Sequence, residues 1–456
     1  MQFLSLLRQA PRPLAFGALH SFGSSFGQTF LVALFVPFIG ASLAINETEF
    51  ANIYAGITIA SALCLPFIGR LIDRIDMLRY SLATMVLLTI GCLLIAAAQS
   101  AWMLIAALFI LRLAGQGLMS HVSMTGIARY FDRSRGRALA IASFGFPLAE
   151  AIMPVTLLAL IAGFGWRATY AGAGIFIVVI LMPIAILLIR DNAKFREAPG
   201  KMENNSKTAS ANQEVARDTS PTGSHPRLFR SRYIWFCMPM LAAPPLVMTA
   251  LFFHQGSISA SKDIDLTWFA AGFTVFAITS VIGAFGSGPL IDSHTARKLF
   301  PYHLIPAIGA VSLLAITETP VMIPVYMGML GITTGFATTL RTAIIPELVP
   351  LDEIGAVRST LTAVMVLASA IGPAIYGWMF AADIDIATTL WITIVAMAVV
   401  SVLSWMSERP GFYIPPGVAR QTGEEGRGIS KSEIDDETKN GPELKRARAS
   451  RENSVV

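Results

Sequence analysis

Long apolar stretches separated by short polar segments run along most of the chain. Each is about twenty residues long, which is enough for a helix to cross the roughly 30 Å hydrocarbon core of a bilayer. Barrel strands are disfavoured, because they alternate in polarity and run only about ten residues. The pattern predicts an all-α polytopic membrane protein with twelve transmembrane helices. The predicted spans are residues 14–40, 51–72, 80–99, 102–125, 137–163, 167–189, 233–258, 267–291, 301–316, 320–345, 354–380 and 385–407.

A short motif repeats between the two halves of the chain. The run Gly69-Arg70-Leu71-Ile72-Asp73 returns 219 residues later as Gly288-Pro289-Leu290-Ile291-Asp292, and the same offset relates Pro154 to Pro373. One offset shared by separate helix-breaking residues indicates two tandem halves, which in transporters move around a site between them. We therefore predict pseudo-symmetric six-helix bundles at 1–189 and 233–407, a cytoplasmic linker at 190–232 and a disordered cytoplasmic tail at 408–456.

Composition and charge agree with a membrane location. Hydrophobic residues make up 54% of the chain and charged residues 14%, against about 25% charged in soluble proteins. Loops on one side carry most of the arginines, whereas the other side carries only Arg167 and Lys262 together with acids such as Glu47. The positive-inside rule then places both termini in the cytoplasm. The net charge of +5 thus reports topology and does not indicate nucleic-acid binding; we expect a monomer in the cell (inner) membrane.

The sequence gives no sign of an enzyme, a metal site or a cofactor. Its three cysteines, Cys64, Cys92 and Cys237, fall in or near predicted spans and lack metal-ligand spacing, so packing roles are expected. There is no Gly-rich phosphate loop to bind ATP.

The loop between the second and third spans resembles a signature of the major facilitator superfamily, and the resemblance extends over about residues 14–407. Gly69, Leu71, Asp73 and Arg74 match the pattern G-x-L-x-D-R-x-G-R, with Asp76 where the second glycine is expected. The resemblance implies alternating access with a gate at this loop. Glycine would let helices approach closely, and Asp73 would sit against a helix N-terminus. A tight turn with a solvated aspartate is the alternative.

Gly288 and Asp292 form the expected degenerate second copy of that gate motif. Elsewhere, the segment from Arg129 to Ala138 and the run Gly165-Trp166-Arg167 resemble the monocarboxylate and oxalate/formate porter branch. That branch often has a basic residue in its eighth helix, and span 267–291 has none. The helix 5 pattern of drug exporters is not intact after Gly145, which disfavours an exporter.

Two ionisable residues lie deep inside predicted spans. Arg112 is about ten residues into a span, where a lone guanidinium costs at least about 2.5 kcal/mol, so a partner, water or an anionic substrate must compensate. Arg112 is therefore the first candidate to bind an anionic substrate, and a structural ion pair is its alternative role. Glu150 is the acid nearest to mid-span, and burial disfavours the charged form of a carboxyl, so it is the candidate coupling acid. A static Arg112–Glu150 pair remains an open alternative.

Five more polar residues are candidate substrate contacts. Arg341 lies late in the tenth span, where it alternatively snorkels to the interface. His20 and Gln28 lie in the first span, and His254 and Gln255 lie near the outer end of the seventh. A structural role is the alternative for both histidines.

These features predict a secondary active transporter of a small organic solute. An anion such as a monocarboxylate is favoured, moved by alternating access and driven by a proton or by exchange. The alternatives are an exporter of amphipathic compounds and a transporter-like membrane receptor or sensor that signals through residues 408–456.

Overall fold

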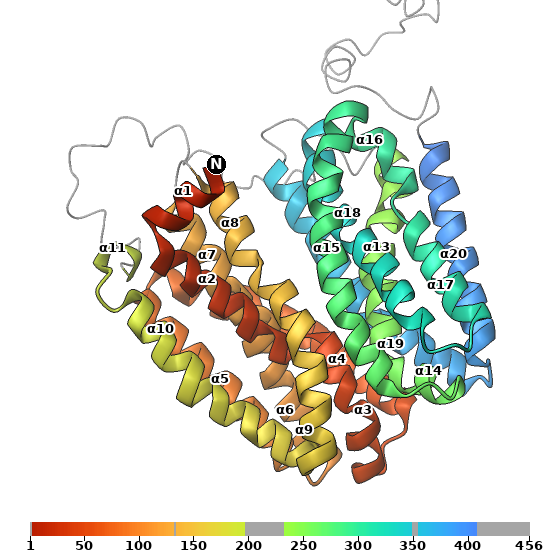
Figure 1. Cartoon of the computed structure of the whole chain (residues 1–456), viewed down its shortest axis with the longest axis horizontal. Helices are drawn as coiled ribbons and strands as arrows, with labels where there is room; N and C mark the ends of the chain where they lie inside the picture. Colours follow the sequence, from red (N-terminus) through yellow and green to blue (C-terminus); the bar gives the residue numbers. More distant parts are fainter. Residues whose placement is uncertain (1, 132–133, 197–231, 349–353, 408–456) are drawn as a thin grey trace, which may run out of the picture.

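The computed structural model describes residues 2–131, 134–196, 232–348 and 354–407. Within these ranges all regular structure is helical, as predicted, and the helices form two bundles, one from each half of the chain (Figure 1). Most of the predicted linker and the whole predicted tail lie outside the described residues.

The first half contains six spans, several of them interrupted. Short helices α1 (Gln2–Gln9) and α11 (Ala193–Arg196) flank them. The spans are α2 (Pro11–Gly23) with α3 (Thr29–Leu43); α4 (Glu47–Gly69); α5 (Met77–Ala96); α6 (Ala101–Leu111), a π-helical stretch (Arg112–Met119) and α7 (Ser120–Tyr130); α8 (Arg135–Ser143) with the start of α9 (Gly145–Phe176); and the rest of α9 with a π-helical stretch (Ile177–Leu181) and α10 (Met182–Ile189).

The second half also contains six spans. They are α13 (Arg232–Phe253) with α14 (Gln255–Ser261); α15 (Leu266–His294); α16 (Ala296–Leu299), a 3-10 turn (Phe300–Tyr302) and α17 (Ile305–Ile316); α18 (Met322–Leu348); α19 (Ile354–Ala381); and α20 (Ile386–Met406).

One continuous helical run contains two of the predicted spans. It extends over 55 residues, Arg135–Ile189, and a straight helix of that length would be about 80 Å long. The chain instead turns at Gly165, whose φ of 79° and ψ of 162° are not helical, and Figure 1 shows this turn at the lower end of α9. Ten described helical runs are long and apolar enough to cross a membrane, or eleven with the bent pair α13–α14. Dividing the long run at Gly165 recovers all twelve predicted spans.

The sequence repeat reappears in the positions where helices begin. α4 and α15 begin at 47 and 266, α5 and α16 at 77 and 296, and α8 and α19 at 135 and 354, so each pair is separated by 219 residues. The N-caps of α4 and α15, Asn46 and Asp265, have the same separation. Each side chain accepts a backbone hydrogen bond of 2.8 Å, from Glu49 and Thr267 respectively, as Asn and Asp at N-caps commonly do. The two halves are therefore built on one plan.

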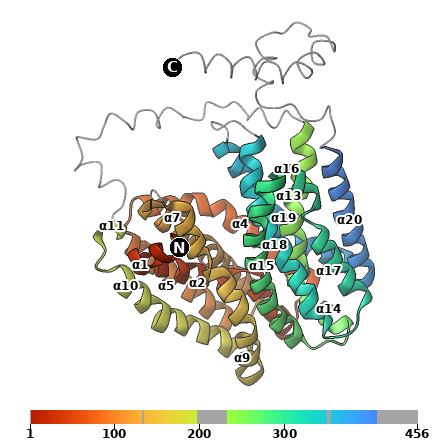
Figure 2. The ribbon, with the colours of Figure 1, turned by 45° about the horizontal axis from the view of Figure 1, so that its top comes forward.

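The halves meet most closely at one end of the molecule. We call the end that bears the N-terminus the terminal face, and the opposite end, with residues 44–46 and 262–265, the far face. α3 and α4 from the first half pack against α13, α14 and α19 from the second. At the far face Thr48 donates to the carbonyl of Gly377 at 2.8 Å, and Trp378 donates to Asn52 at 2.8 Å. In Figure 1 the bundles converge at this lower end and diverge towards the terminal face. Figure 2 shows the same two bundles side by side after a 45° turn.

Candidate functional site

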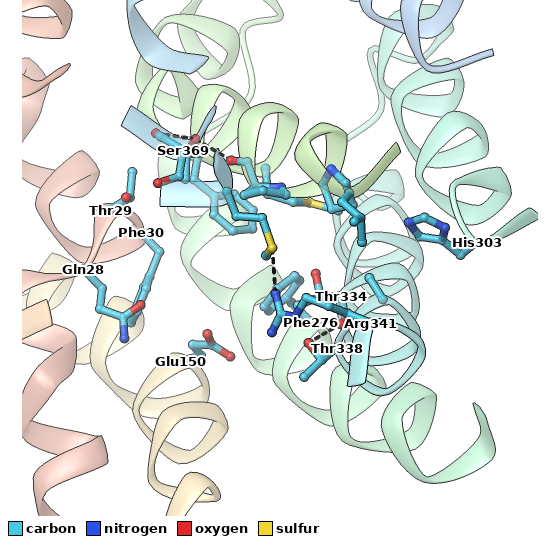
Figure 3. Close-up of a pocket in the computed structure, with 18 of the residues that line it drawn as sticks. Gln28, Thr29, Phe30, Glu150, Phe276, His303, Thr334, Thr338, Arg341 and Ser369 are labelled. Carbon is cyan, nitrogen blue, oxygen red and sulfur yellow. Dashed lines mark hydrogen bonds between the residues drawn. The ribbon is translucent and has the colours of Figure 1, made fainter. Parts of the chain in front are cut away.

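A cavity of about 240 Å³ lies between the two halves. Spans 1, 4 and 5 of the first half and spans 7 to 11 of the second contribute to its wall. Much of the wall is apolar, with Phe30, Met248, Phe252 and Phe276 among its residues. A polar set lines the same space: Gln28, Thr29, Gln116, Glu150, Thr249, His303, Thr334, Thr338, Arg341 and Ser369. Figure 3 labels all of these residues except Gln116 and Thr249. An apolar pocket with a few polar groups is typical of small-molecule sites.

An acid and a base face this cavity from opposite halves. Glu150 comes from α9 and Arg341 from α18, and Figure 3 shows both side chains directed into the space. Arg341 Nη1 donates to Met365 Sδ at 3.3 Å, and a thioether is only a weak acceptor. No described carboxylate forms an ion pair with Arg341. A guanidinium with unused donors can bind a carboxylate in a bidentate manner.

Arg112 does not line the cavity. Its side chain is buried with 2% exposure, and its Nη1 donates to the carbonyl of Gly27 at 2.9 Å. Its guanidinium carbon lies 4.8 Å from the ring centroid of Tyr54, a cation–π contact that partly compensates its charge. Among the described ion pairs none joins Arg112 to Glu150, so the structure does not contain the static pair left open above.

Two glycines bring the first and fourth spans together beside Arg112. A Cβ on Gly115 would lie 2.6 Å from the backbone nitrogen of Gly27, and one on Gly27 would lie 2.4 Å from the carbonyl oxygen of Leu111. The first span is broken here by a 3-10 turn, and the fourth carries its π-helical stretch, a feature frequent at functional sites. Backbone contact thus holds the carbonyl of Gly27 against Arg112, while the next residue, Gln28, lines the cavity.

His20 lies inside the first bundle and does not line the cavity. Its Nδ1 donates to the carbonyl of Phe16 at 2.8 Å, and its Nε2 lies 2.6 Å from the hydroxyl of Ser81. These contacts tie α2 to α5. His20 therefore has structural hydrogen bonds inside the first bundle and is not grouped with the candidate residues that line the cavity.

His254 and Gln255 lie at the far face, where α13 and α14 meet at a bend of 58°. His254 Nδ1 is 2.6 Å from Oε1 of Glu47, and its Nε2 donates to the carbonyl of Pro373 at 2.8 Å. Neither polar atom of the buried Gln255 amide has a described hydrogen-bond partner. Both residues are separate from the cavity.

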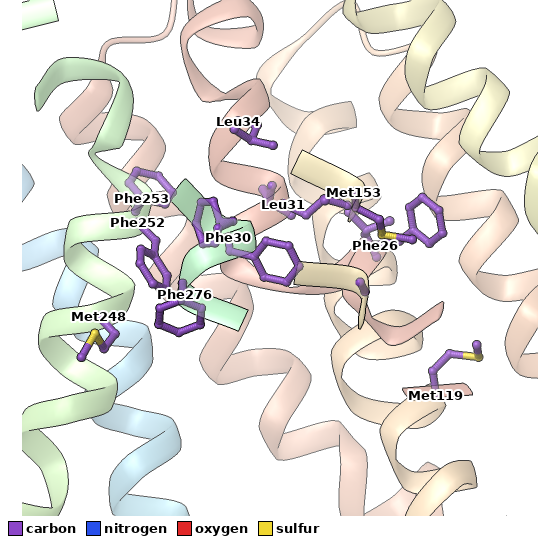
Figure 4. Close-up of a cluster of buried hydrophobic side chains, with 14 of the residues drawn as sticks. Phe26, Phe30, Leu31, Leu34, Met119, Met153, Met248, Phe252, Phe253 and Phe276 are labelled. Atoms are coloured by element: carbon purple, nitrogen blue, oxygen red, sulfur yellow. The ribbon is translucent and has the colours of Figure 1, made fainter. Parts of the chain in front are cut away.

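Aromatic side chains from both halves lie between the cavity and this far-face cluster. Figure 4 shows Phe30 of the first half beside Phe252, Phe253 and Phe276 of the second. The rings of Phe30 and Phe273 have centroids 5.5 Å apart. The cavity is therefore closed towards the far face by packed rings.

The loop motif forms an ion pair within one half. Asp73 pairs with Arg129 of α7, whose Nη1 also donates to the carbonyl of Ile72 at 3.1 Å. No described hydrogen bond joins Asp73 to a helix N-terminus in this structure, and the gating role of Asp73 stays a prediction. Asp76 caps α5 by accepting from the backbone of Arg79 at 3.1 Å, because it directly precedes the helix.

The glycines of the motif do not mediate close helix approach in this structure. A Cβ on Gly69 would have its nearest neighbour at 3.4 Å, an ordinary contact, and one on Gly288 would meet nothing within 4 Å. Arg74 and Asp292 are exposed. No described residue forms an ion pair with either.

Sequence reasoning missed three residues that the structure makes prominent. His303 lines the cavity and donates from Nδ1 to the carbonyl of Phe300 at 2.7 Å. It stood near the edge of a predicted span, but helical structure begins at Ala296 and leaves it buried. Gln116 also lines the cavity. Glu47, expected only as a loop acid, reaches across to the second half.

Two six-helix bundles around a central cavity define the fold of a secondary transporter. The sequence profile of the Major Facilitator Superfamily matches residues 18–315 and 261–447. The chain therefore belongs to this superfamily and is a multi-pass membrane transporter, not an enzyme.

Solved structures with the same fold include a bacterial homolog to the human lysosomal transporter Spinster. Its inward-facing, occupied form is 16% identical with a TM-score of 0.64, and the match covers 90% of this chain and 97% of that one. Its inward-facing, unoccupied form is 15% identical with a TM-score of 0.64, covering 87% and 96%. Identities this low show the fold alone. Comparison with the curated proteins gives no match.

Proposed function

We propose that the chain transports a small organic anion, such as a monocarboxylate, by alternating access coupled to a proton, with anion exchange as its other mode. The observation that supports this most is the unpaired acid and base facing one cavity from opposite halves. Arg341 lacks a described carboxylate partner, and no described residue bonds to the Glu150 carboxyl. A substrate carboxylate can supply the missing partner of Arg341.

Glu150 is assigned the proton. A carboxyl in a largely apolar cavity without a cationic partner favours its neutral form. When Glu150 ionises, its negative charge competes with the substrate for Arg341. Binding of the anion is thereby linked to binding of the proton. Arg112 lies behind the cavity wall in this conformation, so we propose that it holds the first and fourth spans together. We propose that Arg341 binds the anion.

The arginine-rich terminal face is assigned to the cytoplasm by the positive-inside rule. The far face, where the halves are joined, is then the outer side. On this assignment the structure is inward-facing, with the outer side closed by the aromatic cluster and by the contacts of Thr48 and Trp378.

A second candidate is transport of amphipathic compounds. It is favoured by the aromatic and methionine side chains in the wall, among them Phe252 and Met248. Such a substrate would gain more from these side chains than from Arg341.

Binding to the purified protein separates the two candidates. A panel of short monocarboxylates, dicarboxylates, neutral sugars and amphipathic cations is measured against the wild type, Arg341→Gln and Arg341→Lys. Hydrogen bonds to charged groups contribute about 1.5–3 kcal/mol, so Arg341→Gln is expected to weaken carboxylate binding about ten- to a hundred-fold. Arg341→Lys should retain part of it.

The matched control is Lys298→Gln, because Lys298 is an exposed cation of the same half that does not line the cavity. It should leave binding within a few-fold of the wild type. Equal carboxylate affinity in Arg341→Gln, or binding of amphipathic cations alone, would contradict the anion proposal.

A further inference from the structure

The contact between Glu47 and His254 is the most polar link between the halves at the far face. Glu47 is the first residue of α4, and His254 joins α13 to α14. His254 is fully buried. The hydroxyl of Ser257 donates to the second oxygen of Glu47, so both carboxyl oxygens are engaged by the opposite half.

The geometry fixes how many protons this contact holds. The carbonyl of Pro373 can only accept, so the 2.8 Å contact requires a hydrogen on Nε2 of His254. The 2.6 Å contact between Nδ1 and Oε1 of Glu47 requires a second hydrogen. That hydrogen lies on the ring, as in an imidazolium–carboxylate pair, or on Glu47, as in a neutral pair. In both cases the contact holds one proton more than a neutral histidine and an ionised carboxylate.

Few other titratable groups face His254. From α19, Tyr376 stacks on its ring with centroids 5.8 Å apart, and the Tyr376 hydroxyl is bonded to Thr393 at 2.7 Å. From α4, the Tyr54 ring packs on Phe253, with centroids 5.1 Å apart, and its hydroxyl donates to Thr29, so it is not directed at His254. Helix α3 carries no titratable side chain. Glu49 is turned away and accepts from the backbone of Asn46. The proton is therefore shared by Glu47 and His254.

We propose that Glu47 and His254 form a proton-binding site that holds the outer gate closed, where the outer gate is the set of far-face contacts between the halves. The two residues belong to opposite halves, so opening the gate must separate them and expose the buried His254 to water, whereas the Glu47 side chain is already 27% exposed. Above about pH 6.5 a separated histidine is neutral and a separated carboxylate is ionised. Opening then releases one proton, and rising pH favours the open gate.

Linkage gives the size of the effect. When the closed state binds one proton more than the open state, the open-to-closed ratio rises up to ten-fold per pH unit. This gate requires no substrate, so it can be measured whether or not the anion proposal holds.

The experiment measures the width of the outer gate in the full chain in nanodiscs. Spin labels are placed on Ala41→Cys and Ala382→Cys, two exposed far-face positions on opposite halves, and the parent chain serves as the labelling blank. Distance distributions are recorded from pH 6 to pH 9 without added solute. In the otherwise wild-type protein, the longer-distance population should grow with pH.

Three variants identify the site. In Glu47→Gln the amide can donate to an unprotonated Nδ1, so the outer gate can close without binding the extra proton. The dependence of the open-to-closed ratio on pH, up to ten-fold per pH unit in the wild type, should therefore be lost. Ser257→Ala loses one hydrogen bond but keeps both proton-sharing groups, so it should shift the ratio towards open and keep the slope. Glu49→Gln, two residues from Glu47, should keep the slope.

A pH-independent distance distribution in the wild type would overturn the proposal, and so would equal slopes in the wild type and Glu47→Gln. If Glu47→Gln does not insert into the membrane, the wild type and Ser257→Ala still test the proposal. The open-to-closed ratio must rise steeply with pH in both, and a flat pH dependence in either would overturn the proposal.

Discussion

Replacing Gly115 by alanine should disturb the contact that positions Arg112. The new Cβ would lie 2.6 Å from the backbone nitrogen of Gly27 and 2.7 Å from its Cα. Ordinary contact begins near 3.4 Å, so the first span must retreat by about 0.8 Å. The obstacle is backbone, which cannot rotate away as a side chain can. Overpacking of this kind costs about 1–3 kcal/mol.

Gly56→Ala is the matched control, because a Cβ there would meet nothing within 4 Å. Both variants gain up to about 1 kcal/mol from the better helix propensity of alanine, so the difference between them isolates the contact. Each purified variant is unfolded in detergent with heat or denaturant. The free energy of unfolding of Gly115→Ala should be about 1–3 kcal/mol lower than that of Gly56→Ala. Equal stability of the two would refute the backbone contact and its role in holding the carbonyl of Gly27 on Arg112.

Three further predictions concern the other candidates. Asp73→Asn should slow transport while leaving substrate binding within a few-fold, because the side chain is 57% exposed and pairs far from the cavity; total loss of binding in folded protein would argue against a gating role. His20→Leu should lower the free energy of unfolding by about 1–3 kcal/mol, because it strands buried partners such as the Ser81 hydroxyl, yet leave carboxylate affinity unchanged; a selective loss of affinity would restore His20 to the site. An impermeant maleimide added outside intact cells should label Ala382→Cys and spare Ser293→Cys, and the reverse pattern would invert the topology.

Much of the fold could be predicted because the signals that define it are local. Apolar length reports the spans, and N-capping residues such as Asn46 and Asp265 mark where helices begin. The turn at Gly165 is local too, because a φ of 79° is readily available only to glycine.

The residues of the site were harder to predict. The sequence shows how deep a side chain lies in the membrane, but it does not show towards which side of its helix the side chain points. Arg112 and Arg341 both lie within spans, and only Arg341 lines the cavity. The π-helical stretch that begins at Arg112, and its contact with the carbonyl of Gly27, have no signature in the sequence. The Glu47–His254 contact joins residues 207 positions apart, and no periodicity reports such a pair.

Accumulation of a radiolabelled monocarboxylate by proteoliposomes tests the central claim most directly. With an imposed proton gradient, the wild type should concentrate the anion above its equilibrium level, and a protonophore should abolish this accumulation. Glu150→Gln should still exchange labelled for unlabelled anion, because the amide mimics the protonated carboxyl, but should not concentrate it. If the wild type moves no carboxylate in either mode, or if Glu150→Gln concentrates it as the wild type does, the account is contradicted.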